Sequence, residues 1–133
     1  MKKLMLLLSI ALVACDGVTT YKITKPKLPL ENVEVKKEHF VDKGDQNKDG
    51  SYGYYYEYDI YDFCKNKFCY SVRAYTDTTE EASFMSSTKG YISTNDFSEP
   101  LFIYSYFYLK EKEGKTKIDY LTGSGYKEIK LVY

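Results

Sequence analysis

The sequence predicts an all-β fold: a single antiparallel sandwich or small barrel of about seven strands, with at most one short helix near residues 78–87. Three observations support this prediction. Apolar or aromatic residues alternate with polar ones over several segments of strand length. Turn-forming residues separate these segments at 44–50, 114 and 123–125. The chain also contains 16 Tyr and 7 Phe, and aromatic residues favour strands.

Residues 1–14 have the features of a cleaved export signal. Two lysines precede an apolar run over 4–14, which would make a helix of roughly 16 Å, too short for a bilayer core of about 30 Å. The run ends in LVAC at 12–15, which resembles the lipobox of bacterial lipoprotein precursors. The resemblance implies that Cys15 is lipidated and becomes the mature N-terminus. The alternative is a buried N-terminal helix that contains a cysteine.

Lipidation would anchor the protein in a membrane without a spanning helix. One acyl chain holds a protein only marginally, and two or three hold it stably, because each buried methylene contributes about 0.8 kcal/mol. Asp16 follows the cysteine and resembles the signal that retains enterobacterial lipoproteins at the inner membrane. We therefore expect a bacterial membrane location, on the periplasmic side of a Gram-negative envelope, with the inner membrane favoured.

Residues 16–31 are predicted to form a tether. Pro26 and Pro29 discourage regular structure, and no sustained period appears. An extended chain of this length reaches up to roughly 50 Å. The predicted organisation is a signal peptide at 1–14, a lipidated N-terminus and tether at 15–31, and a β domain at 32–133.

The first two strands are expected in residues 32–42 and 51–63. The second of these alternates strictly, and the face that we expect to be buried carries Tyr52, Tyr54, Tyr56, Tyr58 and Ile60. Its other face mixes two tyrosines with Glu57 and Asp59.

Cys64 and Cys69 enclose four residues, a good length for a hairpin loop. Opposed strand residues bring their Cα atoms about 4.5–5.5 Å apart, which a disulfide accepts, and an exported domain keeps such a bond. A metal site would need further ligands, and the only histidine, His39, is distant in the sequence. A redox pair normally has the spacing Cys-x-x-Cys. The spacing thus predicts a structural disulfide.

The later segments predict more strands and one helix. Tyr70, Val72 and Ala74 should face inward from the strand that follows the cysteines. Residues 78–87 suggest the helix, since a threonine could cap a turn that begins with two glutamates. Residues 101–110 are apolar or aromatic on both faces, which indicates a central strand. Further strands are expected near 90–94, 115–122 and 126–133.

Asp45, Asn47 and Asp49 match the opening of a calcium-binding loop, Asp-x-Asn-x-Asp-Gly. The match then fails, because Tyr56 stands where the loop requires a bidentate glutamate, and the flanking segments read as strands rather than helices. A polar turn is the better interpretation, and calcium remains a weak candidate.

The tyrosines are the main candidates for a binding surface, since each combines a large apolar ring with a polar tip. Core and sheet packing explains most of them. An exposed patch for a protein, a glycan or an apolar ligand is a second interpretation. Its candidates are Tyr55, Tyr61, Tyr75, Tyr104, Tyr106 and Tyr108.

The sequence contains no arrangement typical of a catalytic site, such as Gly-x-Ser-x-Gly. A hydrolase would need a cleft in which His39 meets a carboxylate pair such as Glu57 and Asp59. Loss of the two signal-peptide lysines leaves two more acidic than basic residues, so no basic field would attract nucleic acid. We expect neither a cofactor nor a nucleic-acid partner.

These observations predict a lipid-anchored envelope protein that acts as a non-catalytic binding or interaction module. Its partners would be the membrane, through the lipid, and an envelope protein or glycan. The main alternative is an inhibitor or immunity protein that neutralises an envelope-targeting toxin or lysozyme, and a small hydrolase is the third interpretation.

Overall fold

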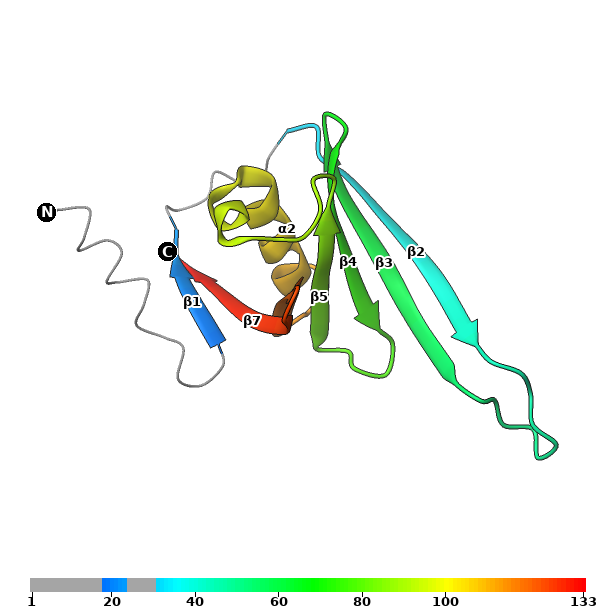
Figure 1. Ribbon diagram of the computed structural model, residues 1–133. Helices are drawn as coiled ribbons and strands as arrows, with labels where there is room; N and C mark the ends of the chain where they lie inside the picture. The colour runs from blue at the N-terminus through cyan, green and yellow to red at the C-terminus, as the bar shows by residue number, and fades with distance from the viewer. Residues whose placement is uncertain (1–17, 24–30) are drawn as a thin grey trace, which may run out of the picture.

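A seven-stranded sheet forms the frame of the protein (Figure 1). The computed structural model describes residues 18–23 and 31–133, and the strands lie in the order β1-β7-β6-β5-β4-β3-β2. The strands are β1 (Val18–Lys22), β2 (Glu34–Lys43), β3 (Tyr55–Lys65), β4 (Phe68–Tyr75), β5 (Glu81–Ser87), β6 (Lys117–Thr122) and β7 (Gly125–Val132). The prediction of a mostly β fold with about seven strands is confirmed.

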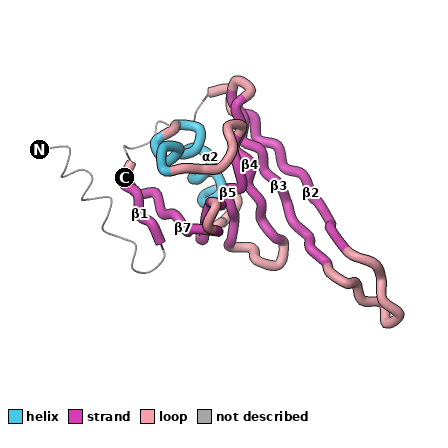
Figure 2. The backbone as a smooth tube through the Cα atoms, in the orientation of Figure 1, coloured by secondary structure: helices cyan, strands magenta, loops and turns pink. Residues whose placement is uncertain are grey.

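The sheet is mixed rather than purely antiparallel. The pairs β1–β7 and β5–β6 are parallel, and the other four pairs are antiparallel. A 3-10 helix, η2 (Thr94–Ser98), and an α-helix, α2 (Pro100–Glu111), supply the crossover between β5 and β6. Both lie on one face of the sheet (Figure 2). We call this the inner face and the opposite one the outer face.

The core lies between α2 and the inner face, and it is rich in aromatic rings. The ring of Phe102, on α2, lies 4.4 Å from Phe84 of β5 and 5.3 Å from Tyr70 of β4, between ring centroids. The ring of Phe97, on η2, lies 5.4 Å from that of Phe102, between ring centroids. All four side chains are almost completely buried, so this cluster stabilises the helix against the sheet.

Residues 101–110 form most of α2 and not the central strand that the sequence predicted. A run that is apolar at nearly every position fits a buried helix as well as a buried strand. Pro100 stands at the first turn, where its missing N–H needs no partner. The buried Ser105 hydroxyl donates to the carbonyl of Leu101 at 2.7 Å, so it is satisfied within the helix. No helix in the described residues is long and apolar enough to cross a membrane.

The helix predicted at 78–87 is also incorrect, because Glu81–Ser87 is strand β5. Its Ala82 and Phe84 are buried while Ser83 and Met85 are half-buried, which is the two-residue alternation of a strand. The two glutamates end a turn in which Glu81 donates its backbone N–H to the carbonyl of Thr78 at 3.1 Å. Residues 90–94 supply one isolated bridge at Gly90 rather than a strand.

Residues 18–22, which the sequence assigned to a tether, form β1. This strand pairs with β7 from Val18 opposite Glu128 to Lys22 opposite Val132, and Tyr21 packs edge-on against Phe97 at 5.3 Å. The folded unit therefore includes a strand that precedes residue 32. The predicted signal peptide, Cys15 and Asp16 lie outside the described residues.

The disulfide prediction is confirmed: Cys64 and Cys69 are bonded, with Cα atoms 4.1 Å apart. They pair directly across the β3–β4 hairpin. The loop between the strands is shorter than predicted, since only Asn66 and Lys67 lie outside them. Both residues have positive φ, as a tight two-residue hairpin turn requires.

The β2–β3 hairpin extends beyond the rest of the sheet (Figure 1). Strand β4 pairs with β3 only as far as Tyr58, so the first residues of β3 are paired with the last residues of β2 alone. We call residues 40–58 the arm. The two core positions of β3 are Tyr61 and Phe63, so the face of β3 that the sequence expected to be buried is the outer one.

Candidate functional site

A row of aromatic rings follows the outer face of the arm and continues onto β4. Alternation along β3 fixes this side, because Tyr61 and Phe63 point inward and every second residue between and before them, such as Tyr58 and Tyr56, points outward. We call the row the aromatic strip. It consists of Phe40, Tyr54, Tyr56, Tyr58 and Tyr75.

Successive rings of the aromatic strip are in contact. Ring centroids lie 6.0 Å apart between Tyr54 and Tyr56, and 6.2 Å between Tyr56 and Tyr75. Tyr58 lies 5.9 Å from Tyr75 and 5.7 Å from Phe40. Tyr54 and Tyr56 remain 49% and 52% exposed. The strip is thus a continuous apolar surface that no described element covers.

Arg73 of β4 lies at the end of the strip that is nearer the middle of the sheet. Its guanidinium carbon is 5.0 Å from the ring centre of Tyr75 and 5.8 Å from that of Tyr58, within the range of cation–π attraction. Its Nη2 donates to the hydroxyl of Tyr126 at 2.8 Å. The guanidinium therefore joins the strip on β3 and β4 to β7.

A pocket of about 240 Å³ opens beside this arginine. We call it the sheet pocket, and its lining includes Arg73, Tyr75, Ser83, Asp119 and Tyr126. Two buried polar atoms, Nε of Arg73 and Oδ1 of Asp119, have no hydrogen-bond partner among the described residues. Burial raises the pKa of the Asp119 carboxyl, although a hydrogen bond from Ser83 opposes the shift. The sheet pocket thus offers one unused donor and one unused acceptor.

A larger pocket of about 340 Å³ lies near η2, lined by residues such as Tyr70, Lys89 and Tyr91. Asp96 lines this pocket, and its carboxylate already accepts hydrogen bonds from neighbouring residues. The Tyr70 hydroxyl donates to Oδ1 at 2.7 Å, and the backbone N–H of Ser93 donates to Oδ2 at 2.8 Å. These contacts hold the start of η2, so the sheet pocket is the better candidate for a ligand despite its smaller size.

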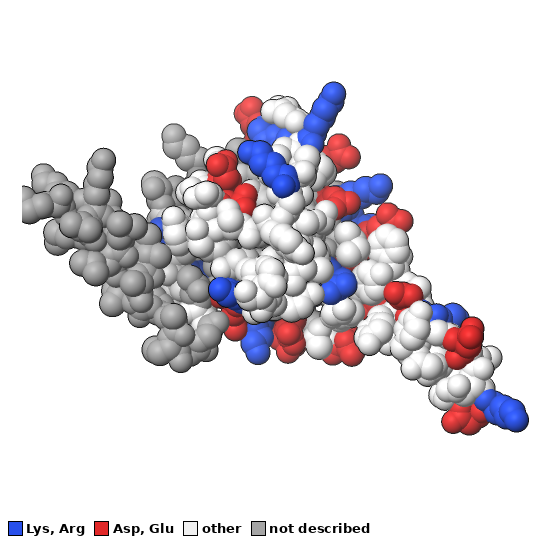
Figure 3. All heavy atoms as spheres, in the orientation of Figure 1, with Lys and Arg blue, Asp and Glu red and all other residues white. Residues whose placement is uncertain are grey.

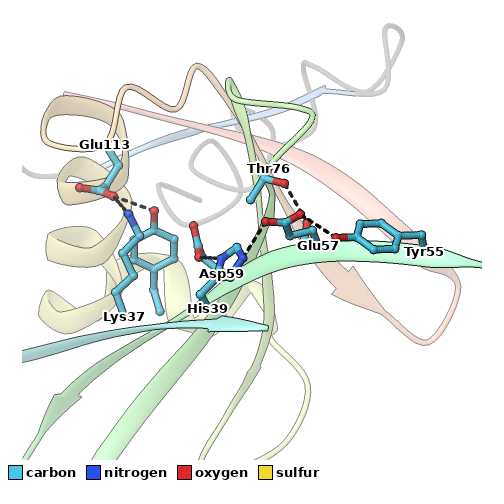
Figure 4. A network of polar contacts seen from close by, with 8 residues as sticks. Lys37, His39, Tyr55, Glu57, Asp59, Thr76 and Glu113 are labelled. Atoms are coloured by element: carbon cyan, nitrogen blue, oxygen red, sulfur yellow. Dashed lines mark hydrogen bonds and ion pairs between the residues drawn. The ribbon is translucent and has the colours of Figure 1, made fainter. Parts of the chain in front are cut away.

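His39 lies on the inner side of the hairpin, at the base of the arm, between two carboxylates (Figure 4). Its Nδ1 is 2.7 Å from Asp59 Oδ1, and its Nε2 is 2.8 Å from Glu57 Oε2. Glu57 also accepts a bond from the Tyr55 hydroxyl at 3.2 Å. The hydrogen bonds to Asp59 and then to Glu57 raise the pKa of the imidazole. Glu57 and Asp59, the carboxylate pair that the sequence analysis named, therefore lie within hydrogen-bonding distance of His39.

This histidine cluster differs from a hydrolytic site in its exposure, in its distance from the pockets, and in the partners of its ring nitrogens. The side chains of His39 and Glu57 are substantially exposed, and neither of the two pockets described above is lined by any residue of the cluster. Each ring nitrogen is already held by a carboxylate, which leaves no nitrogen free to activate a nucleophile. The geometry is that of a polar network that stiffens the base of the arm.

A second polar network connects the base of the arm to α2 (Figure 4). Glu113, just after the helix, accepts from the Tyr61 hydroxyl at 2.7 Å and from Lys37 Nζ at 3.2 Å. It fixes the hairpin where β2 and β3 leave the core.

The six tyrosines proposed from the sequence do not form one surface. Tyr61 and Tyr106 belong to the core, at 2% and 3% exposure, so their assignment to a patch was wrong. Tyr75 belongs to the aromatic strip. Tyr55 is exposed, but on the inner face of the arm, and Tyr104 and Tyr108 are half-buried on α2. The sequence reasoning missed Phe40, Tyr54, Tyr56 and Tyr58 as surface residues.

Asp45, Asn47 and Asp49 lie in the loop at the tip of the arm. Asp49 Oδ1 accepts from the backbone N–H and the hydroxyl of Ser51, at 3.0 and 2.6 Å, and the hydroxyl bond lowers the pKa of this carboxyl. Asn47 accepts the N–H of Gly50 at 3.0 Å. These contacts are those of a turn. Within residues 18–23 and 31–133, no group of three or more His, Cys, Asp or Glu is placed to hold a metal ion.

The visible surface carries both signs of charge. Figure 3 shows acidic and basic side chains interspersed around a broad uncharged area.

No family model, curated protein or solved structure matches this chain.

Proposed function

We propose that this protein is a lipid-anchored, non-catalytic binding module of the bacterial cell envelope, and that its binding surface is the aromatic strip. The observation that carries the proposal is the exposure of Tyr54 and Tyr56 on an arm that leaves the core. Contiguous exposed apolar surface is typical of an interaction site. A partner that covers the exposed half of one such ring gains roughly 0.8–1.5 kcal/mol, about half of what full burial of a large apolar side chain contributes.

The positions of the two sheet edges support this proposal. The lipobox resemblance puts the lipid on Cys15, and only two residues separate Cys15 from the start of β1, a span of at most roughly 10 Å. Strands β1 and β2 are the opposite edges of the sheet, about 29 Å apart along the sheet at ordinary strand spacing. A domain anchored next to β1 would lie close to the lipid surface and present the arm at its far edge.

The histidine cluster supports the non-catalytic part of the proposal. Both nitrogens of His39 are engaged by carboxylates, and on the face that Figure 3 draws, basic side chains are interspersed with acidic ones rather than gathered into a field that attracts nucleic acid. The sheet is fixed by a disulfide and the base of the arm by two polar networks, so the exposed rings are held in place before a partner binds.

An inhibitor or immunity protein is the second candidate function, and the projecting arm is the observation that favours it (Figure 1). A two-stranded arm with exposed rings has a shape that can enter the cleft of a toxin or an enzyme. A toxin or secreted hydrolase gene directly beside this gene would support that function. An isolated gene, or one within an envelope-assembly operon, would count against it.

Site-specific photo-crosslinking tests the binding surface. A photoreactive phenylalanine derivative replaces Tyr56 in the full chain, in the cells that make the protein, and the matched control places it at Tyr55. The two tyrosines are equally exposed, at 52% and 50%, but they lie on opposite faces of the arm. We expect light-dependent adducts from position 56 and far fewer from position 55. Equal adducts at both positions, or none at either, would contradict the proposal.

A further inference from the structure

The sheet pocket and the aromatic strip form one continuous surface. Tyr75 is in contact with Tyr56 at 6.2 Å and also lines the pocket beside Asp119. A ligand in the pocket can therefore continue along the rings of the arm without a break.

We propose that this surface binds a saccharide chain, with one pyranose ring in the sheet pocket and the following rings on Tyr56 and Tyr54. The inference rests on the proposed function, because it names the class of ligand that the same surface takes. It gives a specific role to the two unpartnered polar atoms of Arg73 and Asp119, which line the pocket.

Those two atoms match the hydrogen-bonding groups of a sugar. Nε of Arg73 can donate to a hydroxyl or carbonyl oxygen, and Oδ1 of Asp119 can accept from a hydroxyl or an amide N–H. A buried polar atom without a partner destabilises the fold by about 1–3 kcal/mol. Both atoms are buried, so a rotation of each side chain must turn its atom toward the pocket, where a sugar hydroxyl then supplies the missing partner and removes that destabilisation. Water could satisfy the same atoms, so the apolar contacts must provide the selectivity.

The rings provide those contacts. A pyranose presents several C–H groups on one face, and the rings of Tyr75 and Tyr126 border the pocket, with Tyr126 still 49% exposed. At about 240 Å³ the pocket is smaller than the roughly 300–1,000 Å³ that drug-sized ligands occupy. This volume suits a single sugar ring, and the strip accounts for the rest of a chain.

A neutral ligand fits the charges better than an ion. Arg73 and Asp119 contribute one positive and one negative group to the same pocket. The arginine is already engaged by Tyr58, Tyr75 and the hydroxyl of Tyr126. An anion would meet the carboxylate of Asp119, and a cation would meet the guanidinium. An amino-acid zwitterion could pair with both groups, but it would leave the aromatic strip uncovered.

The test is an NMR titration of the full-length protein in a detergent without a sugar headgroup. The probes are cellotetraose and chitotetraose, added up to about 10 mM, above the millimolar Kd expected of so small a site. The Arg73 Nε–Hε signal reports directly on the donor. We expect it to shift and saturate, together with the backbone amides of Ser83 and Tyr126.

Variants locate the site. Asp119→Ala and Tyr126→Ala should each weaken binding roughly tenfold or more, whereas Asp119→Asn, which keeps an acceptor oxygen, should retain most of it. Tyr55→Ala on the other face and Tyr91→Ala at the second pocket are the matched controls, and both should bind as the parent does. Dispersed amide spectra show which variants remain folded.

The outcomes separate this inference from the proposed function. If neither oligosaccharide shifts the Arg73 signal while crosslinks still form at position 56, the strip binds another class of partner and the saccharide inference is wrong. A dipeptide zwitterion that shifts these signals when neither sugar does would overturn it as well. Sugar binding that persists in Asp119→Ala and is lost in Tyr91→Ala would place the sugar in the other pocket, against the inference.

Discussion

Cys64 and Cys69 face each other at the turn end of the β3–β4 hairpin, with their Cα atoms 4.1 Å apart and their sulfurs bonded. This separation is close to that of a non-hydrogen-bonded antiparallel pair, about 4.5 Å. The pair fixes the register of β3, since it places Phe63 opposite Tyr70 and Tyr61 opposite Val72. A slip by one residue would turn these core side chains to the outer face.

Reducing this disulfide should lower the free energy of unfolding by about 2 kcal/mol, because the bond closes only a short loop in the unfolded chain. The core around Phe102 does not involve the cysteines, so the reduced protein should still fold. Urea unfolding of a Cys64→Ser, Cys69→Ser double variant measures the change.

Mass spectrometry gives the independent check on this bond. Non-reduced, delipidated protein should be two hydrogens lighter than the dithiol form. Two alkylatable thiols in protein taken directly from the native envelope would contradict both the bond and the oxidising compartment.

The position of the Cys64–Cys69 pair shows how much of the arm could be predicted from the sequence. The sequence correctly placed Tyr70 and Val72 inward and correctly opposed the two cysteines. Together these imply that Phe63 and Tyr61 face inward, because each lies opposite one of them. The regular tyrosines from 52 to 58 were taken as the core face instead, since alternation alone does not reveal that an arm leaves the core.

Other differences have a similar physical origin. The segment at 101–110 is apolar at almost every position, so both helix and strand periods fit it, and only packing against Phe84 and Tyr70 decides. Strand β1 is short and pairs with the far end of the chain. Its contacts are entirely non-local, and a scan of neighbouring residues does not detect them. The sheet pocket draws residues from four strands, and for the same reason no local motif indicates it.

Replacing Cys15 with Ala should release the protein from membranes, because the proposed acyl chains are its attachment. Radiolabelled palmitate should be incorporated into the parent chain and not into the variant. The matched control is Cys64→Ser with Cys69→Ser, which keeps Cys15 and should fractionate with membranes as the parent does. A Cys15→Ala variant that still fractionates with membranes would show that the lipid-anchor prediction is wrong.

His39 should titrate above the ordinary histidine value of about 6.5, since the hydrogen bonds that its ring donates to Asp59 and Glu57 raise its pKa. It is the only histidine in the chain, so one imidazole signal in an NMR titration reports it without assignment. Asp59→Asn should lower the pKa, and Glu57→Gln should lower it less, because the bond to Asp59 is the larger cause.

The sign of the stability effect follows from this shift. A raised pKa means that the folded state binds the proton more tightly than the unfolded state. The stabilisation is therefore fully present below about pH 6.5 and is lost as the pH rises through the folded-state pKa. In His39→Gln this pH dependence should disappear, while the stability at high pH should change little. An imidazole that titrates at or below 6.5 in the parent protein would contradict the cluster geometry.

Stability measurements should separate the aromatic strip from the aromatic core. Phe102 is completely buried and touches three other rings, so Phe102→Ala should lower the free energy of unfolding by about 3–5 kcal/mol. Tyr56 is half-exposed, and its ring contacts are with Tyr54 and Tyr75. Tyr56→Ser should therefore lower it by about 1 kcal/mol. Urea unfolding of both variants, beside Tyr55→Ser as the exposed control on the other face, makes the comparison. A loss in Tyr56→Ser as large as that in Phe102→Ala would mean that the strip stabilises the fold, and its exposure would then not indicate a surface for a partner.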